Sequence, residues 1–359
     1  MKHPSRSLAL SKELPIVSWP LKPIFLGILF LPRIVFGQSK GAEIDKYLAP
    51  LAERQQFSGV VLALDKDKVI FERAFGPANA ELNVPNQLNT RFGIASVTKA
   101  MTLAIVMRFA EEGKLSLQDR LGKFIPDFPY ADQITIEMLL QHRSGLIHEV
   151  LKPEEECLPH TAAEVVEKAK LIKPAYKPNE KTLYSNTGYI VLARILEIVA
   201  GRSYQQLLQE YIFARSGMKD SMDFNGEAII KGRAQEYLLE ANGMVHSPLK
   251  DYSSFVGAGS VFSTAQDIYL FAEAALNGKL GESVKSRYKG IFASNGNENG
   301  FRCYVRVDNN LGFGFVLISN LESGANDFII RDLPEILQGK HVETPMLSKP
   351  AVVPDANRD

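Results

Sequence analysis

A serine and a lysine three positions apart, Ser96 and Lys99, are the first candidates for chemistry in this chain of 359 residues. They open residues 92–113, whose second half is a long apolar run ending at Gly113. Such a run predicts a buried helix. Residues three apart share one face of a helix, so the hydroxyl and the amine can meet. Because burial lowers the pKa of a lysine, the pair predicts a nucleophile beside a possible base.

The spacing alone is not specific, because Ser-x-x-Lys occurs four times, at Ser96, Ser216, Ser247 and Ser286. Most such pairs are surface residues without a chemical role. Ser216 falls in a predicted turn, Ser247 precedes a proline, and Ser286 lies in a charged stretch. Only Ser96 opens a segment apolar enough to be a core helix, and this context selects it.

Tyr184-Ser185-Asn186 is the second candidate cluster, at the entrance of an apolar predicted helix, residues 183–201. A tyrosine there can act as acid or base if cations lower its pKa, and an asparagine can hold a substrate carbonyl. The alternative is helix capping by Ser185 or Asn186 with one buried ring. Taken alone, the cluster favours that alternative, although no other Tyr-x-Asn occurs in the chain.

Four segments complete a pattern, in the order FGIASVTKAMT, LLQHRSGL, LYSNTGYIVLARILEIVAG and GAGSVFSTAQDIYLFAEAALNG. Over residues 42–340 the chain resembles the serine β-lactamase and D,D-peptidase family, and most closely its class C β-lactamase-like and esterase branch. The resemblance implies that Ser96 is acylated and that Lys99 helps to deprotonate it. It also implies that Tyr184 shuttles a proton to the leaving group, that Asn186 orients the substrate, and that the Ser96 N–H stabilises an oxyanion.

The third motif of that family is atypical here. Relatives carry Lys or His, one residue and then Gly on a strand beside the nucleophile, whereas the best match in this chain is Ser294-Asn295-Gly296. The resemblance places Ser294 and Gly296 in substrate binding, with the Asn297 N–H as second oxyanion donor. Loss of a charged hydrogen bond weakens binding of a substrate carboxylate roughly 10- to 150-fold.

Two basic residues near this motif, Lys289 and Arg302, are the candidates to replace the missing cation, although neither has the motif's spacing. If one of them lies near Ser96, the enzymatic hypothesis gains. Residues 278–290 are short for the family, so part of a strand region is expected to be missing.

The element order predicts an α/β (α+β) fold. A helix over 45–56 and a hairpin over 57–76 come first, and strands over 301–307 and 312–319 and a closing helix over 326–337 come last. Strands from both ends of the chain predict an antiparallel sheet flanked by helices, with a mainly helical domain inserted. We expect one domain over 38–342, its sheet part at about 42–110 and 255–340 and its helical part at about 111–254, and a loose tail over 343–359.

Composition excludes several classes of function. The chain has 41 basic and 41 acidic residues, which gives no reason to expect nucleic acid or an anionic membrane surface as partner. It has no metalloprotease, Walker or dinucleotide motif, so no metal or cofactor is expected. His142 and His148 are interpreted as structural hydrogen-bonding residues. Cys157 and Cys303 are predicted to be unpaired packing residues, with a single bridge as the alternative.

Residues 1–37 differ from the rest of the chain, with basic residues before a short apolar run over 24–31. The run is too short to span a bilayer and resembles a secretory signal cut after Gly37. An uncleaved anchor and an ordinary leader are the alternatives. A periplasmic or secreted protein is therefore expected, or one tethered to the membrane by this segment.

Two functions follow from these observations. The first is a serine hydrolase that forms an acyl-enzyme on an ester, amide or peptide, with esterase or peptidase activity favoured over efficient β-lactam hydrolysis. The second is a catalytically weak or inactive binding protein of the same fold that recognises cell-wall peptides. Either takes a small-molecule or peptide partner, and the oligomeric state stays open.

Overall fold

A five-stranded antiparallel sheet takes its strands from both ends of the chain, in the order β10-β11-β12-β1-β2. The computed structural model describes residues 39–347, so the predicted signal segment lies outside the described residues. The strands are β1 (Gly59–Asp65), β2 (Lys68–Phe75), β10 (Ile291–Glu298), β11 (Phe301–Asp308) and β12 (Phe313–Ser319). The predicted α/β (α+β) fold with an antiparallel sheet is confirmed.

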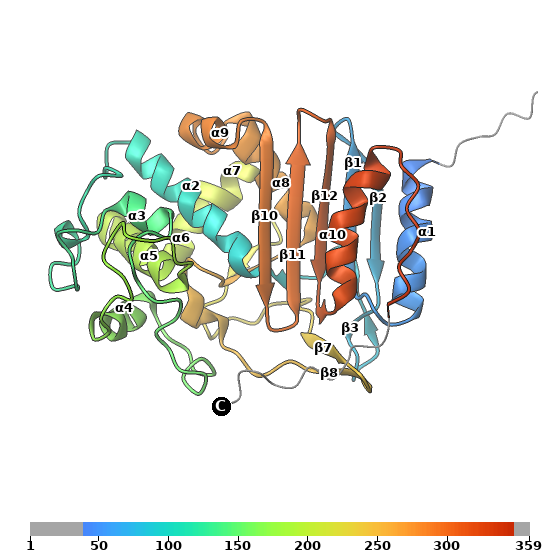
Figure 1. Cartoon of the computed structure of the whole chain (residues 1–359), viewed down its shortest axis with the longest axis horizontal. Helices are drawn as coiled ribbons and strands as arrows, with labels where there is room; N and C mark the ends of the chain where they lie inside the picture. Colours follow the sequence, from blue (N-terminus) through green and yellow to red (C-terminus); the bar gives the residue numbers. More distant parts are fainter. Residues whose placement is uncertain (1–38, 348–359) are drawn as a thin grey trace, which may run out of the picture. The chain divides into compact units, whose positions relative to one another are not determined.

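Both faces of the sheet are covered by helices. Side chains of β1 alternate between two cores, with Val60 and Leu62 on one face and Val61 and Ala63 on the other. Helices α1 (Lys40–Glu53) and α10 (Gly324–Leu337) cover the second face, and α8 (Ala265–Asn277) covers the first (Figure 1). Because both faces of β1 are buried, its residues are apolar without the alternation of a half-exposed strand.

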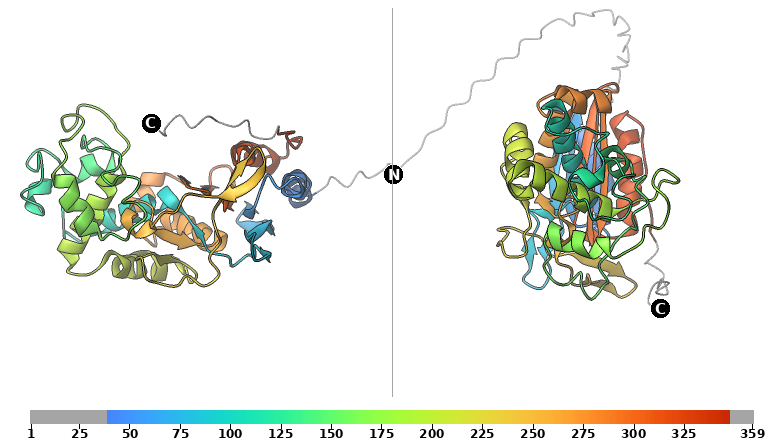
Figure 2. Two further views of the ribbon diagram at one scale, coloured as in Figure 1. Left: turned by 90° about the horizontal axis from the view of Figure 1, so that it is seen from below. Right: turned by 90° about the vertical axis from the view of Figure 1, so that its left-hand side faces the viewer.

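The inserted helices gather beyond the β10 edge of the sheet, as the views in Figures 1 and 2 agree. Helix α2 (Thr98–Glu111) packs between them and the rest of the fold, and its burial on nearly every face confirms the prediction for the apolar run. The others are α3 (Ile136–Leu140), α4 (Ala162–Lys170), α5 (Asn186–Ala200), α6 (Tyr204–Leu208), the π-helical turn η3 (Gln209–Phe213) and α7 (Ala214–Ser216).

Short elements fill the connections. The strands are β3 (Pro77–Asn79), β4 (Val84–Pro85), β5 (Phe92–Gly93), β6 (Met222–Asp223), β7 (Tyr237–Glu240), β8 (Gly243–His246), β9 (Val261–Ser263) and β13 (Leu321–Glu322). The 3-10 turns are η1 (Ala95–Val97), η2 (Leu121–Lys123) and η4 (Tyr252–Phe255). Residues 278–290, where part of a strand region was expected to be missing, form helix α9 (Glu282–Tyr288), which packs on α2 and α8.

The first residues after α10 are attached to α1. Thr344 Oγ1 donates to the Tyr47 carbonyl at 3.0 Å, and Gln56 Nε2 donates to the Leu347 carbonyl at 3.2 Å. The start of the segment expected to be a loose tail therefore has defined partners.

Both cysteines are unpaired, with Cys303 buried in the core. Among the helices of residues 39–347, none has the length and apolar character needed to cross a membrane.

Candidate active site

Ser96, Lys99 and Tyr184 meet at one point of the fold. Lys99 Nζ lies 3.0 Å from Ser96 Oγ, and the Tyr184 hydroxyl donates to Ser96 Oγ at 2.7 Å. The nucleophile candidate sits in the 3-10 turn η1, directly before α2, so one helical turn separates it from Lys99 on the same face. Tyr184 comes from the distant loop before α5. The structure thus brings together three residues that the sequence singled out.

The backbone around Ser96 is held in an uncommon conformation. Ala95 has a φ of +47°, which L-residues rarely adopt and which occurs in strained, functional segments. Strand β10 packs directly against this turn. A Cβ on Gly296 would lie 2.2 Å from the Ile94 carbonyl oxygen and 3.1 Å from the Ser96 nitrogen. Only glycine fits there, and the strand of the third motif therefore reaches the backbone of the nucleophile.

Lys99 is placed to act as a base. Its side chain is buried, and Nζ also donates to the Ala258 carbonyl at 2.9 Å. Burial lowers the pKa of Lys99 to about 7, against the opposing effect of the Glu298 and Glu149 carboxylates. Near neutral pH a large fraction of the amine is therefore unprotonated and can accept the proton of Ser96.

Tyr184 directly precedes the N-cap of α5 and contacts the candidate nucleophile. Ser185 is the N-cap of α5 and accepts from the Gly188 N–H, so the capping alternative is correct for that residue. The Tyr184 ring packs against His142, with centroids 4.6 Å apart, and under Lys99 Nζ at 4.9 Å. Partial burial raises the pKa of Tyr184 despite its bond to Ser96, so the cation-induced lowering considered from the sequence is not found. The residue is a neutral hydroxyl donor.

Asn186 lies at the first turn of α5 and is buried. Its Nδ2 donates to Glu149 Oε1 at 2.7 Å, while its Oδ1 has no hydrogen-bond partner among the described residues. His142 is structural, because its Nδ1 accepts from the Ser185 N–H at 3.1 Å. Burial, with a contribution from nearby Lys99, lowers the pKa of His142 to about 4, which keeps the ring neutral.

Neither expected replacement for the third-motif cation reaches the site. Arg302 pairs with Asp327 of α10 at 2.8 Å, on the opposite face of the sheet from the nucleophile. Lys289 precedes β10. At about 3.3 Å per strand residue, it lies more than about 15 Å from Gly296 along that strand. Both proposed replacements are therefore wrong, and Ser294 stands without them.

The sequence reasoning missed a buried charged cluster next to the third motif. Lys250 is buried and bonds to Glu298 at 2.6 Å and to Glu156 at 3.1 Å. Glu156 is in turn hydrogen-bonded to Glu149. Glu298 could have been found, because it follows Gly296 by two residues and shares its strand face. Lys250 lies in a segment without periodicity, and Glu156 belongs to a charge run that was interpreted as solvated.

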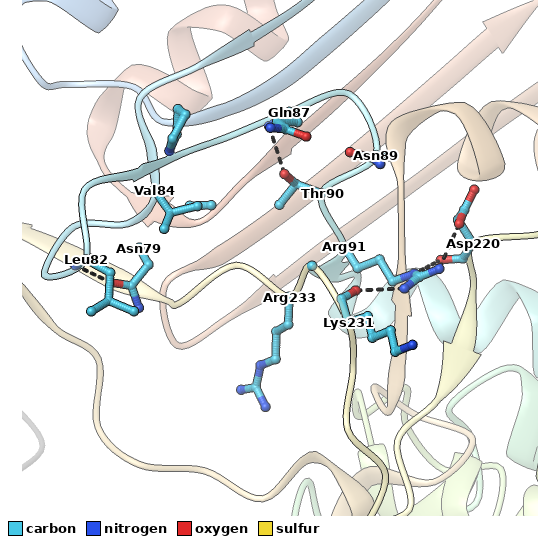
Figure 3. Close-up of a pocket in the computed structure, with 13 residues that line it drawn as sticks. Asn79, Leu82, Val84, Gln87, Asn89, Thr90, Arg91, Asp220, Lys231 and Arg233 are labelled. Carbon is cyan, nitrogen blue, oxygen red and sulfur yellow. Dashed lines mark hydrogen bonds and ion pairs between the residues drawn. The ribbon is translucent and has the colours of Figure 1, made fainter.

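An open pocket of about 460 Å³ lies elsewhere, lined by residues 78–91 and 220–233 (Figure 3). Several of its polar groups are paired with one another. Arg91 bonds to the Asp220 carboxylate and to the Lys231 carbonyl, both at 2.7 Å, and Thr90 accepts from the Gln87 N–H. None of the candidate catalytic residues lines this pocket.

Within the described part of the chain, no group of three or more His, Cys, Asp or Glu residues is arranged to hold a metal ion.

Comparisons with known proteins identify the family of the chain. The beta-lactamase family profile matches residues 44–339. Penicillin-binding protein 4* of Bacillus subtilis (strain 168) is 31% identical over 193 residues, which are 52% of this chain and 43% of that protein. Teichoic acid D-alanine hydrolase of Staphylococcus aureus is 29% identical over 167 residues, or 46% of this chain and 40% of that protein. The matches span less than half the length of these relatives.

Solved structures show the same fold at low identity. The D-amino acid amidase from Ochrobactrum anthropi SV3 has a TM-score of 0.73 at 23% identity, covering 84% of this chain and 97% of its own. FmtA from Staphylococcus aureus has a TM-score of 0.73 at 21% identity, covering 88% and 93%. The family profile covers most of the chain. This chain belongs to the beta-lactamase family.

Proposed function

We propose that this protein is a serine hydrolase that forms an acyl-enzyme on Ser96 from an ester, amide or peptide. One observation carries the proposal: Ser96 Oγ lies within hydrogen-bond distance of both Lys99 Nζ and the Tyr184 hydroxyl. A nucleophile, a base with a pKa of about 7 and a proton donor are thereby present at one position.

In acylation, neutral Lys99 takes the proton of Ser96 while Oγ attacks the substrate carbonyl carbon. A C–O bond forms and the carbonyl becomes a tetrahedral oxyanion. When this intermediate collapses, the bond to the leaving oxygen or nitrogen breaks, and the Tyr184 hydroxyl supplies its proton. The protonated Lys99 then returns a proton to the Tyr184 oxygen, so both residues recover their starting protonation states. The leaving group departs as a neutral alcohol or amine.

Deacylation reverses these roles. A water molecule attacks the acyl carbon and loses its proton to the same pair of residues. The bond from the carbon to Ser96 Oγ breaks, and the serine oxygen recovers a proton from Lys99. The acid product and the free enzyme remain.

The oxyanion is proposed to bind two backbone N–H groups, those of Ser96 and Asn297. Support comes from Gly296, whose lack of a side chain lets β10 approach the Ser96 nitrogen. Removing one such donor costs about 2.7–4 kcal/mol of transition-state stabilisation in other hydrolases. In this scheme Asn186 and Ser294 line the substrate side.

Ester and amide substrates are favoured over β-lactams. Ser294 carries no charge, and the buried Lys250 is paired with carboxylates, so neither of these described residues offers a free cation to a substrate carboxylate. Two similar proteins are named a teichoic acid D-alanine hydrolase and a D-amino acid amidase, and neither name refers to a β-lactam. Because Ser294 is uncharged, a second function also stays a candidate: a binding protein of the same fold that does not turn over its ligand.

Action outside the cytoplasm is part of the proposal, supported by the secretory pattern of residues 1–37. Fractionation of cells that express the full chain, with immunoblotting for size, tests it. A protein of full length in the cytoplasm alone would contradict it.

The test of the reaction uses residues 38–359 with p-nitrophenyl acetate and a chromogenic cephalosporin, beside Ser96→Ala. We expect ester hydrolysis, an acyl adduct on Ser96 in the intact mass, and loss of both in Ser96→Ala. Ser216→Ala is the matched control, because Ser216 has the same Ser-x-x-Lys spacing and lies in α7. Absence of turnover together with absence of an adduct would favour the binding protein.

A further inference from the structure

Three carboxylates and one ammonium group form a connected network on the substrate side of the site. Glu298 and Glu156 bond to Lys250, and Glu149 bonds to Glu156 and to Asn186. Glu149 and Glu298 lie close enough to Lys99 to oppose the lowering of its pKa by burial. The network meets the site at Asn186, two residues after Tyr184, and at Glu298, two residues after Gly296 on the same strand face.

The network carries an excess of negative charge. Lys250 is its one full cation, and it is occupied, with Glu298 at 2.6 Å, Glu156 at 3.1 Å and the Phe255 ring at 4.3 Å. Burial and the neighbouring Glu149 raise the pKa of Glu156 to about 7, so one proton is partly shared by that pair. Two carboxylate charges, on Glu149 and Glu298, then face a single ammonium charge. Each of the two is only partly buried, with 26% and 22% of its side chain exposed.

A second observation points to a ligand with hydrogen-bond donors. Asn186 is about nineteen-twentieths buried, and its Oδ1 has no partner within the described residues, while its Nδ2 is bonded to Glu149. A buried acceptor without a partner costs about 1–3 kcal/mol. The amide oxygen and the Glu149 carboxylate together offer acceptors to one donor group.

We propose that the site selects acyl substrates that carry an ammonium group near the scissile carbonyl, bound by Glu149, Glu298 and the Asn186 amide oxygen. This selectivity rests on the proposed hydrolase function and narrows its substrate class. An ammonium group supplies three donors and a positive charge, which match the two partly exposed carboxylates and the unpaired acceptor. A substrate carboxylate at the same place meets like charge and no free cation.

Binding of such a substrate also assists the base. The negative charges of Glu149 and Glu298 hold the pKa of Lys99 higher than burial alone would leave it. A bound ammonium group offsets those charges, so a larger fraction of Lys99 becomes neutral in the complex. The same contact then contributes to both affinity and proton transfer.

The test compares three alanine methyl esters that differ in the charge carried by the amino substituent, namely the free-amine, the N-acetyl and the N-succinyl ester, each as both enantiomers. Methanol release gives kcat/KM. We expect the free-amine ester to be preferred over the neutral one by roughly tenfold or more, since charged hydrogen bonds contribute about 1.5–3 kcal/mol. The succinyl ester should be the poorest. The preference should shrink as salt is raised.

Glu149→Gln and Glu298→Gln keep shape and remove one charge each, and each should reduce the ratio of kcat/KM between the free-amine ester and the neutral ester. Glu282→Gln, on the exposed side of α9, is the matched control and should change nothing. Thermal unfolding checks that each variant is folded. If one Gln variant fails to fold, the other gives the comparison.

Ser96-dependent turnover without any preference for the amine overturns the inference and leaves the hydrolase proposal intact. If no substrate is turned over, the hydrolase proposal fails. Calorimetric binding of alaninamide and N-acetylalaninamide to Ser96→Ala then tests the selectivity directly. Tighter binding of the free amine supports it, and equal or absent binding overturns it.

Discussion

The two sides of the candidate active site are built differently. The nucleophile side places Ser96, Lys99 and Tyr184 at the ends of two buried helices, and its key groups are uncharged or close to their pKa at neutral pH. The third-motif side consists of an edge strand and loops, and it holds three carboxylates around Lys250. In the proposed mechanism, the first side carries out the reaction and the second selects substrates by their charge. Substitutions on the two sides should therefore differ in which kinetic constant they change.

Tyr184→Phe should have the largest effect among the following substitutions. It removes the hydroxyl that donates to Ser96 at 2.7 Å but keeps the ring against His142. Loss of a general acid lowers kcat by about 10²–10⁴-fold. Tyr304→Phe, on the far face of β11, is the matched control and should keep full activity. Steady-state hydrolysis of a neutral p-nitrophenyl ester measures both, and an unchanged kcat in Tyr184→Phe would remove that residue from the mechanism.

Gly296→Ala tests the contact between the two sides. Its Cβ would meet the Ile94 carbonyl oxygen at 2.2 Å, so β10 and the nucleophile turn must move apart. A displacement of about 1 Å can reduce the rate about 10²-fold. The control is Gly324→Ala at the start of α10, where a Cβ meets nothing within 4 Å. Equal ester hydrolysis by the two variants would show that the approach of β10 is unimportant.

Ser294→Lys places a cation in the third motif, on the strand face that carries Gly296. We expect kcat/KM for a chromogenic cephalosporin, which carries a carboxylate, to rise roughly 10- to 150-fold relative to wild type. Turnover of a neutral ester should change little. Ser294→Met is the control for side-chain length. A cephalosporin rate that stays at the wild-type value would mean that charge at this position does not set selectivity.

The pH dependence of wild-type turnover should follow Lys99. Its pKa is lowered to about 7, so below that pH the amine is protonated and cannot accept the serine proton. The value of kcat/KM for a neutral ester should therefore fall about tenfold per unit on the acid side and level off above pH 7. Removing the charge of Glu298 should move the midpoint to lower pH. A flat profile between pH 5 and 8 would exclude Lys99 as the base.

Local sequence determined most of the nucleophile side. The apolar run after Ser96 could only be a buried helix, and a helix fixes the relation of Ser96 to Lys99 within one turn. The alternation and turn residues of the strands likewise predicted the antiparallel sheet. That Tyr184 belongs to the same site followed from the family pattern, since nothing local links it to Ser96.

Only the tertiary structure decided the charges on the other side. Whether Arg302 or Lys289 reached the site depended on which face of the sheet each occupied and how far along β10 it lay. Lys250 comes from a segment without periodicity and Glu156 from a charge run, and only long-range packing brings the two side chains together. The dielectric environment of a charged side chain depends on what packs around it, and this is set only when the chain folds. The Ser96–Lys99 pair could therefore be predicted from its spacing and its apolar context, whereas the proposed preference for a substrate charge depends on burial and proximity.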